Sequence, residues 1–208
     1  MTDPESTSPT QQALGFSYDE GHAEQGITAM AGIPLLVQAF RSLGLPASVK
    51  RNVSVKQRQR GWDEATYVES FVILNATGGE CLDDFARLRQ DAVSELIGHR
   101  LPSPEAARKF LYQFHDEERI EAARHQLGPG KSSYIVEEND ALRGLGQVNT
   151  DLVRELARRG EQQKIATIDL DSTVIESWKQ EAHATYQGGR GYQPLLALWA
   201  ETNLILAD

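Results

Sequence analysis

Apolar residues recur at helical spacing along most of the chain before residue 160. Side chains three and four positions apart lie on one face of a helix, so such a stripe indicates a helix whose apolar face packs on a core. The stripes predict helices over residues 27–43, 62–75, 82–97, 104–114, 117–127 and 138–159.

Several of these predicted helices have recognisable ends. Asp63 and Ser103 are placed as N-terminal caps, and Pro104 fits the first helical position, where its missing N–H costs nothing. Gly44 is expected to end the first helix, and we expect a bend near Asp91 in the third.

After residue 160 the pattern changes from helical stripes to short apolar runs. The run that starts at residue 165 leads to Asp169 and Asp171, which predicts a buried strand with carboxylates at its C-terminal end. A turn-rich segment, 187–192, precedes an apolar run over 195–207 that is rich in strand formers. Helices followed by strands indicate an α+β fold with two regions rather than one alternating α/β unit.

Composition limits the class of protein without identifying it. The chain has 208 residues, 40% of them hydrophobic and 25% charged, which is ordinary for a folded globular protein. No apolar run approaches the roughly 18 residues of a membrane span, and the acidic N-terminus is unlike a secretory signal, so we expect a cytoplasmic protein without a membrane partner. The single cysteine, Cys81, excludes an internal disulfide and is expected in the core.

The net charge of −9 is unevenly distributed along the chain. Residues 1–24 hold five acidic residues and no Lys or Arg, and their Ser, Thr, Pro and Gln content predicts a disordered acidic tail. The remainder carries only −4. The overall charge therefore does not exclude a partner as acidic as DNA.

Two groups of positive residues are candidate DNA contacts. The first lies in a stretch without acidic residues, which we expect to be a connector between helices; it comprises Lys50, Arg51, Lys56, Arg58 and Arg60. The second, Arg108 and Lys109, lies on the helix that begins at Pro104, which could be the reading helix of a helix-turn-helix. A solvated surface in the first case, and an ordinary bundle helix in the second, are the alternatives.

Asp169 and Asp171, with hydroxyl side chains directly after them, form a candidate metal site. Mg²⁺ prefers oxygen ligands and retains some of its waters, so carboxylates at a strand end suit it. The alternative is structural, because Asp, Ser and Thr after a strand are also common turn and capping residues.

The segment from residue 165 to 173 resembles the first motif of haloacid-dehalogenase-type phosphatases. That resemblance would make Asp169 the nucleophile and Asp171 the acid/base. Only 37 residues follow Asp171, too few for the core of that family and its later lysine and acidic residues.

A second resemblance extends over most of the chain. Short segments follow one another as in the N-terminal part of bacterial insertion-sequence transposases with a DDE (group 1) catalytic domain. They are GIPLL at 32–36, RQRGW at 58–62, GGECLDD at 78–84, LRQD at 88–91, LPSP at 101–104, RKFL at 108–111, DLDST at 169–173 and YQGGRGY at 186–192.

This resemblance implies a helical DNA-binding region over 25–160 and the start of a ribonuclease H-like catalytic domain over 161–208. Asp171, with Asp169 as second choice, would bind Mg²⁺ (or Mn²⁺) together with two later carboxylates, for DNA strand cleavage and transfer. The partner would be the double-stranded terminal repeats of the element. The 186–192 segment is expected to be a structural hairpin.

The later carboxylates of the family have no counterpart in the sequence, so we expect an incomplete catalytic domain that is inactive alone. Self-association, or association with an intact transposase, is then expected. A DNA-binding inhibitor without catalysis is the alternative function.

Overall fold

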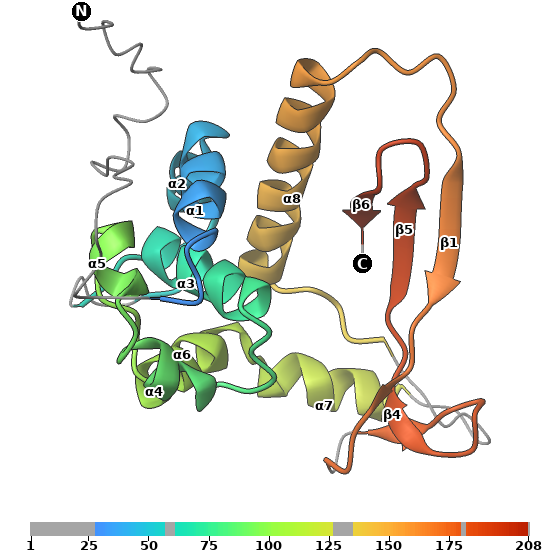
Figure 1. The fold of residues 1–208 in the computed structure, drawn as a ribbon. Coiled ribbons are helices and arrows are strands. Elements are labelled where there is room, and N and C mark those ends of the chain that lie inside the picture. Colours follow the sequence, from blue (N-terminus) through green and yellow to red (C-terminus); the bar gives the residue numbers. More distant parts are fainter. Residues whose placement is uncertain (1–27, 57–60, 127–134, 180–181, 208) are drawn as a thin grey trace, which may run out of the picture. The chain divides into compact units, whose positions relative to one another are not determined.

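The computed structural model describes residues 28–56, 61–126, 135–179 and 182–207 (Figure 1). The chain divides into two compact units, Met1–Phe114 and His115–Asp208. The division falls within the helical region 25–160, so the last two helices of that region belong to the second unit. The acidic tail over 1–24 lies outside the described residues.

The described part of the first unit is helical. Its helices are α1 (Ile33–Ser42), α2 (Leu45–Asn52), α3 (Glu64–Ala76), α4 (Asp84–Leu88), α5 (Val93–Ile97) and α6 (Pro104–Leu111), with a 3-10 turn, η2 (Tyr112–Phe114), after α6. The stripes over 27–43, 62–75 and 104–114 correspond to α1, α3 and α6. The region over 82–97 is divided into α4 and α5, as the expected bend near Asp91 requires.

The predicted helix ends are confirmed. The Asp63 carboxylate accepts a hydrogen bond from the Thr66 N–H at 2.9 Å, and the Ser103 hydroxyl accepts one from the Ala106 N–H at 3.2 Å. Each bond satisfies an N–H that would otherwise lack a partner in the first turn. Gly44 ends α1 in a left-handed conformation with φ of 76°, where a side chain would be strained.

The predicted connector over 50–60 is wrong for its first residues, because 50–52 belong to a helix that was not predicted from the sequence. Leu45 and Val49 are buried one turn apart, and this apolar pair packs α2 on the unit. Pro46 lies in the first turn of α2, a position that tolerates proline. Lys50 is therefore in the last turn of a helix and not in a loop.

The core of the first unit lies between α1, α3, α4, α5 and α6. Its fully buried members include Ile73, Phe85, Leu88 and Val93. Burying an apolar side chain of this size contributes about 1.5–3 kcal/mol, so these positions hold the short helices together. Cys81 is exposed, and its expected place in the core is wrong.

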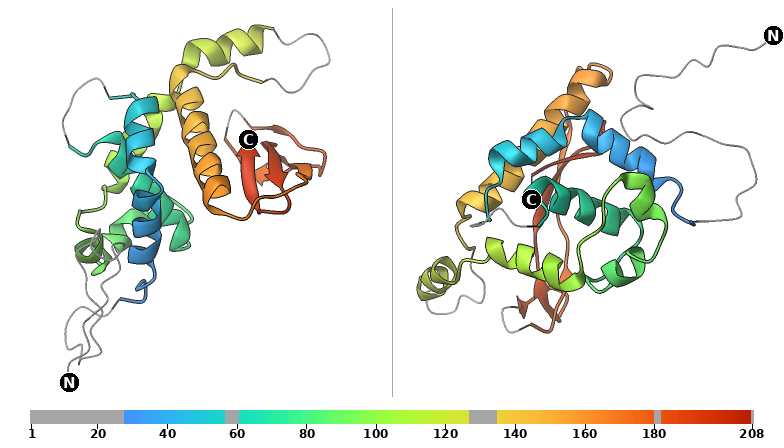
Figure 2. Two further views of the ribbon diagram at one scale, coloured as in Figure 1. Left: turned by 90° about the horizontal axis from the view of Figure 1, so that it is seen from above. Right: turned by 90° about the vertical axis from the view of Figure 1, so that its left-hand side faces the viewer.

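The described part of the second unit combines two helices with two small antiparallel sheets (Figure 2). The helices are α7 (Glu117–His125) and α8 (Asp140–Arg159). One sheet has the order β1-β5-β6 and contains β1 (Ile168–Ser172), β5 (Leu195–Trp199) and β6 (Leu204–Ala207). The other has the order β2-β4-β3 and contains β2 (Ile175–Glu176), β3 (His183–Ala184) and β4 (Arg190–Tyr192).

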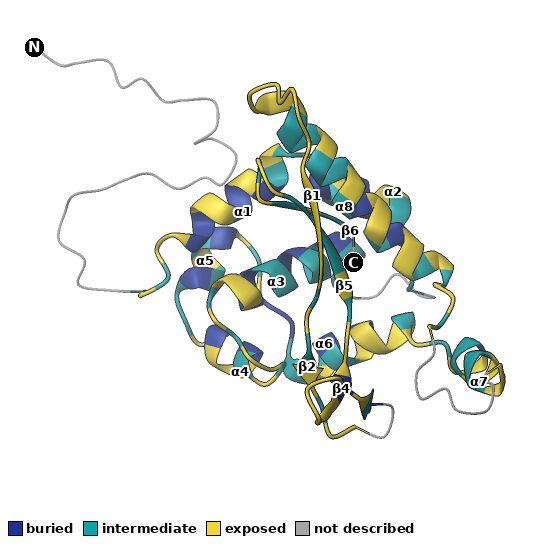
Figure 3. Ribbon diagram, turned by 90° about the vertical axis from the view of Figure 1, so that its right-hand side faces the viewer, coloured by how far each residue is buried: buried dark blue, intermediate teal, exposed yellow. Residues whose placement is uncertain are grey.

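The α+β class is confirmed, and two details of the strand prediction are wrong. The 195–207 run is two strands, because the chain turns back at Asn203, whose φ is 56°. The first strand is not buried: Leu170 is 66% exposed, and β1 is exposed along most of its length (Figure 3). Asp169 and Asp171 both lie within β1, and Asp171 is next to its last residue, near the predicted C-terminal end.

Helix α8 runs alongside β6 (Figure 2). The Asn149 side-chain amide donates to the carbonyl oxygens of Ile205 and Leu206 at 3.0 and 3.2 Å, which ties the helix to the edge of the sheet. Among the described residues, no helix is both long enough and apolar enough to cross a membrane.

Candidate functional site

The two strand aspartates lie on one face of the β1-β5-β6 sheet. Residues two apart in a strand point to the same side, and directly paired residues share that side. Asp169 pairs with Leu198 and Asp171 pairs with Leu196, so the carboxylates border apolar side chains of β5. Both aspartates are exposed, and Asp171 Oδ1 accepts the Ser172 N–H at 2.9 Å.

The two carboxylates on this face are oxygen donors of the kind that a hard divalent cation prefers. A third carboxylate, Glu201, is already engaged, because it accepts hydrogen bonds from the Thr167 N–H and hydroxyl, the latter at 2.6 Å. Those bonds, the side-chain bond first, lower the pKa of Glu201. Nowhere in the described ranges do three His, Cys, Asp or Glu side chains gather closely enough to hold a metal ion.

A hairpin follows the acidic strand, as the 187–192 segment predicts. β3 and β4 pair antiparallel across a turn in which Gly188 has φ of 90° and donates its N–H to the Thr185 carbonyl at 3.1 Å. Gly191 lies against the backbone of Ile175 with no room for a Cβ. Gly188 and Gly191 are therefore explained by backbone geometry.

The first group of predicted DNA contacts is divided by the structure. Lys50 and Arg51 lie in the last turn of α2, and Lys56 follows that helix. Arg58 and Arg60 lie outside the described residues. The segment does not form one continuous positive surface, because the Lys50 ammonium forms an ion pair with Asp63 Oδ2 at 3.0 Å.

Asp63 is more strongly acidic than an ordinary aspartate. Partial burial alone would raise its pKa, but hydrogen bonds from Thr66 and from Lys50 outweigh burial and lower it to about 2. The carboxylate therefore caps α3 and holds Lys50 at the same time.

The second group is exposed on α6, opposite the buried Ala107 and Phe110. Lys109 lies 3.1 Å from Glu105, and Arg108 lies 3.5 Å from Glu105 and 3.7 Å from Asp83. Exposed ion pairs of this kind contribute about 0–1 kcal/mol. Both side chains can therefore exchange these partners for phosphate at low cost.

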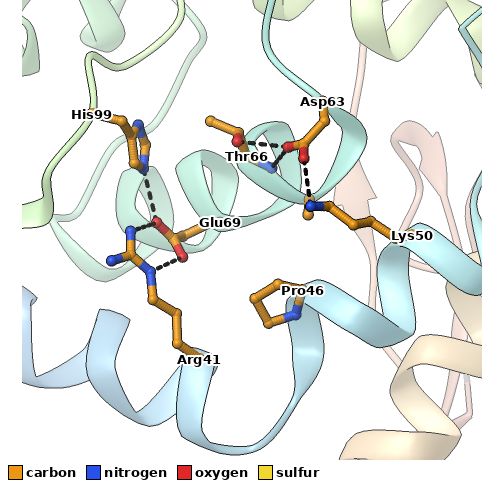
Figure 4. A pocket seen from close by; sticks show the side chains of 8 residues that line it. Arg41, Pro46, Lys50, Asp63, Thr66, Glu69 and His99 are labelled. Atoms are coloured by element: carbon orange, nitrogen blue, oxygen red, sulfur yellow. Dashed lines mark hydrogen bonds and ion pairs between the residues drawn. The ribbon is translucent and has the colours of Figure 1, made fainter. Parts of the chain in front are cut away.

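Among the described residues of the first unit, the most deeply buried charged group is Glu69, which sequence patterns did not single out (Figure 4). Its side chain is 5% exposed. Arg41 of α1 donates to both carboxylate oxygens, at 2.7 and 2.9 Å, and also to the Ile97 carbonyl at 2.9 Å. His99 Nε2 lies 2.8 Å from Glu69 Oε1.

Within the cluster of Arg41, Glu69 and His99, the pKa of Glu69 is lowered and the pKa of His99 is raised. Burial alone would raise the pKa of Glu69, but hydrogen bonds from His99 and Arg41 outweigh it and lower that pKa. Burial alone would lower the pKa of His99, but its bonds to Glu69 and to the Arg100 carbonyl raise it. Both shifts favour a charged, fully paired cluster that joins α1, α3 and the segment after α5.

A cavity of about 130 Å³ adjoins this cluster and is also lined by Lys50, Asp63 and Thr66 (Figure 4). The charged groups of its walls are already paired with one another, so the cluster acts as a structural cross-link. A sequence signal for it does exist: Glu69 is the one charged residue after the first turn of an otherwise largely apolar helix.

Comparisons with protein-family models, with curated proteins and with solved structures give no match for this chain.

Proposed function

We propose that this chain is part of a DNA transposase with a ribonuclease H-like, metal-dependent catalytic domain. One observation carries the proposal. The two aspartates of the DLDST motif stand on one face of β1, which is the first strand of an antiparallel three-stranded sheet that follows a helical region. This is where the resemblance to DDE transposases requires the first catalytic carboxylate.

In this proposal Asp171 is the first metal ligand, and Asp169 is the second choice for that role. Their oxygens suit Mg²⁺ or Mn²⁺. When bound, such an ion activates water and then a DNA 3′-hydroxyl for attack on phosphodiester bonds. By the resemblance, two further carboxylates complete the metal site.

The helical unit would bind the terminal repeats of the element. Positive side chains hold the phosphates and position the protein, while base contacts give specificity. The contacts proposed from the sequence are Lys50, Arg51, Lys56, Arg58, Arg60, Arg108 and Lys109. The side chains of Lys109 and Lys50 are 74% and 62% exposed, and this exposure supports the proposal because a phosphate can reach them.

The first test is DNA binding by the chain itself. Overlapping duplexes from the DNA on both sides of its coding sequence would be compared with unrelated duplexes of equal length in mobility-shift assays. The proposal expects a small number of duplexes to bind far more tightly than the unrelated ones, with affinity falling as salt rises. Binding of no duplex, even at low salt, would overturn it.

The second test addresses Asp171. Duplexes that bind would be incubated with Mn²⁺, the chain and a polypeptide that carries the missing carboxylates, and strand cleavage would be measured. The proposal expects cleavage with the unchanged chain and none with Asp171→Asn, whereas binding is equal in both.

A DNA-binding inhibitor is the alternative function. It is favoured by the lack of a third metal-ligating side chain near Asp171 in the part of the chain that the structure describes. Sequence-specific binding that blocks cleavage by an intact transposase, with no contribution from Asp171, would support this alternative.

A further inference from the structure

A large cavity lies in the first unit, beside α4 and α5. It has a volume of about 770 Å³, within the range of ligand sites. Its walls are predominantly polar and include Arg89, Gln90, Ser94 and Arg100. Neither the cluster around Glu69 nor the DNA contacts predicted from the sequence contribute to it.

Core residues fix the two arginines of this cavity. Arg89 follows Leu88, and Arg100 precedes Leu101, and both leucines are fully buried. Between them, α5 is held by Val93 and Ile97, which are also buried. The two guanidinium groups therefore extend from backbone that packing holds in place.

These arginines differ from four other positive side chains of the unit. Arg41, Lys50, Arg108 and Lys109 each form an ion pair. Within the described ranges, the guanidinium groups of Arg89 and Arg100 form no hydrogen bond or ion pair. Binding an anion would therefore break no existing salt bridge at either residue.

Uncharged polar and acidic side chains also line the cavity. The Ser94 hydroxyl oxygen is inaccessible to solvent and has no hydrogen-bond partner among the described residues. Of the two acidic residues in the wall, Asp91 is already engaged by the Thr28 hydroxyl at 2.5 Å and the Val93 N–H at 2.9 Å. Asp91 keeps its negative charge in these bonds, and Glu95 is the second negative charge of the wall.

We propose that Arg89 and Arg100 form a binding site for phosphodiester groups of DNA at the rim of this cavity. Guanidinium groups match phosphate with two parallel hydrogen bonds, which makes arginine well suited to this ligand. The Gln90 side-chain amide, also in the wall, supplies further donors. The inference rests on the proposed DNA-binding function. It assigns some of the phosphate contacts to Arg89 and Arg100, which are not among the DNA contacts predicted from the sequence.

The experiment measures binding of a fluorescein-labelled, mixed-sequence DNA duplex by fluorescence anisotropy over a range of KCl concentrations. The full chain would be compared with R89Q/R100Q, with E95Q and with the control R87Q. Arg87 is exposed on α4, two residues from Arg89, but does not line the cavity. Circular dichroism would establish that all variants fold equally.

Counterion release predicts the size of the effect. Each lost phosphate contact weakens binding by about eightfold near 0.1 M salt, so R89Q/R100Q should bind about sixtyfold more weakly. Its salt dependence should be shallower by about 1.8 in log–log slope. E95Q should bind more tightly than the unchanged chain. R87Q should lose much less affinity per removed charge than the double variant.

The inference is overturned if the unchanged chain binds the duplex but the loss in log affinity per removed charge is the same for R89Q/R100Q and R87Q, because general surface charge then explains the effect. In that case the proposed DNA-binding function stands. If the unchanged chain does not bind duplex DNA at all, the proposed function falls together with this site.

Discussion

Replacing Glu69 with glutamine tests the buried cluster of the helical unit. Glu69→Gln keeps the shape of the side chain and removes its charge. Arg41 and His99 are then left without their shared counter-ion, and their side chains are only 29% and 19% exposed. Water cannot fully replace the lost carboxylate at either residue.

The expected cost follows from the burial of the partners. Removing one member of a buried ion pair costs roughly 3–5 kcal/mol, because a charge is left buried and unpaired. Arg41 is partly exposed and regains some hydration, so we expect the lower end, about 3 kcal/mol. That is a large fraction of the stability of a domain of this size.

The effect should also depend on pH. Because the pKa of Glu69 is lowered, its stabilisation is present above its ordinary value of 4.5 and is lost as pH falls through the native pKa. Because the pKa of His99 is raised, its stabilisation is present below 6.5 and is lost as pH rises through the native pKa. The difference in the free energy of unfolding between the native protein and Glu69→Gln should be largest between pH 4.5 and 6.5.

Urea denaturation followed by circular dichroism measures this difference at several pH values. Glu80→Gln is the matched control, since Glu80 is an exposed acid of the same unit, and it should change stability by less than about 0.5 kcal/mol. If Glu69→Gln costs no more than Glu80→Gln, or if the difference is independent of pH, the cluster is not a stabilising cross-link.

Three further changes test local features of the structure. Asp63→Ala removes the N-cap of α3, so urea denaturation should show a loss of about 1 kcal/mol in stability. In the native protein the stabilisation from Asp63 is lost as pH falls through its pKa of about 2, and the variant should lack this pH-dependent loss. Gly191→Ala places a Cβ against the Ile175 carbonyl oxygen, so it should speed proteolytic cleavage within 175–192, whereas Gly189→Ala, in open space, should not. Cys81 should react fully with a thiol reagent in the folded chain, and protection until unfolding would contradict its exposure.

Elements whose causes are local could be predicted from the sequence. The cap at Asp63 and the Ser103-Pro104 start each act within one helical turn, so they can be read from neighbouring residues. The apolar stripes located the helices for the same reason. The change to short apolar runs after residue 160 was enough to indicate an α+β protein.

Which surfaces are buried, and which charges meet, depends on the tertiary fold. Glu69 lies in a helix that looks apolar, and only the approach of Arg41 and His99, 28 and 30 residues away, stabilises a buried carboxylate there. The apolar run before Asp171 predicted a buried strand, but no described element covers β1, and it is exposed. Burial and ion pairing depend on partners distant in the chain, which a local pattern of residues does not specify.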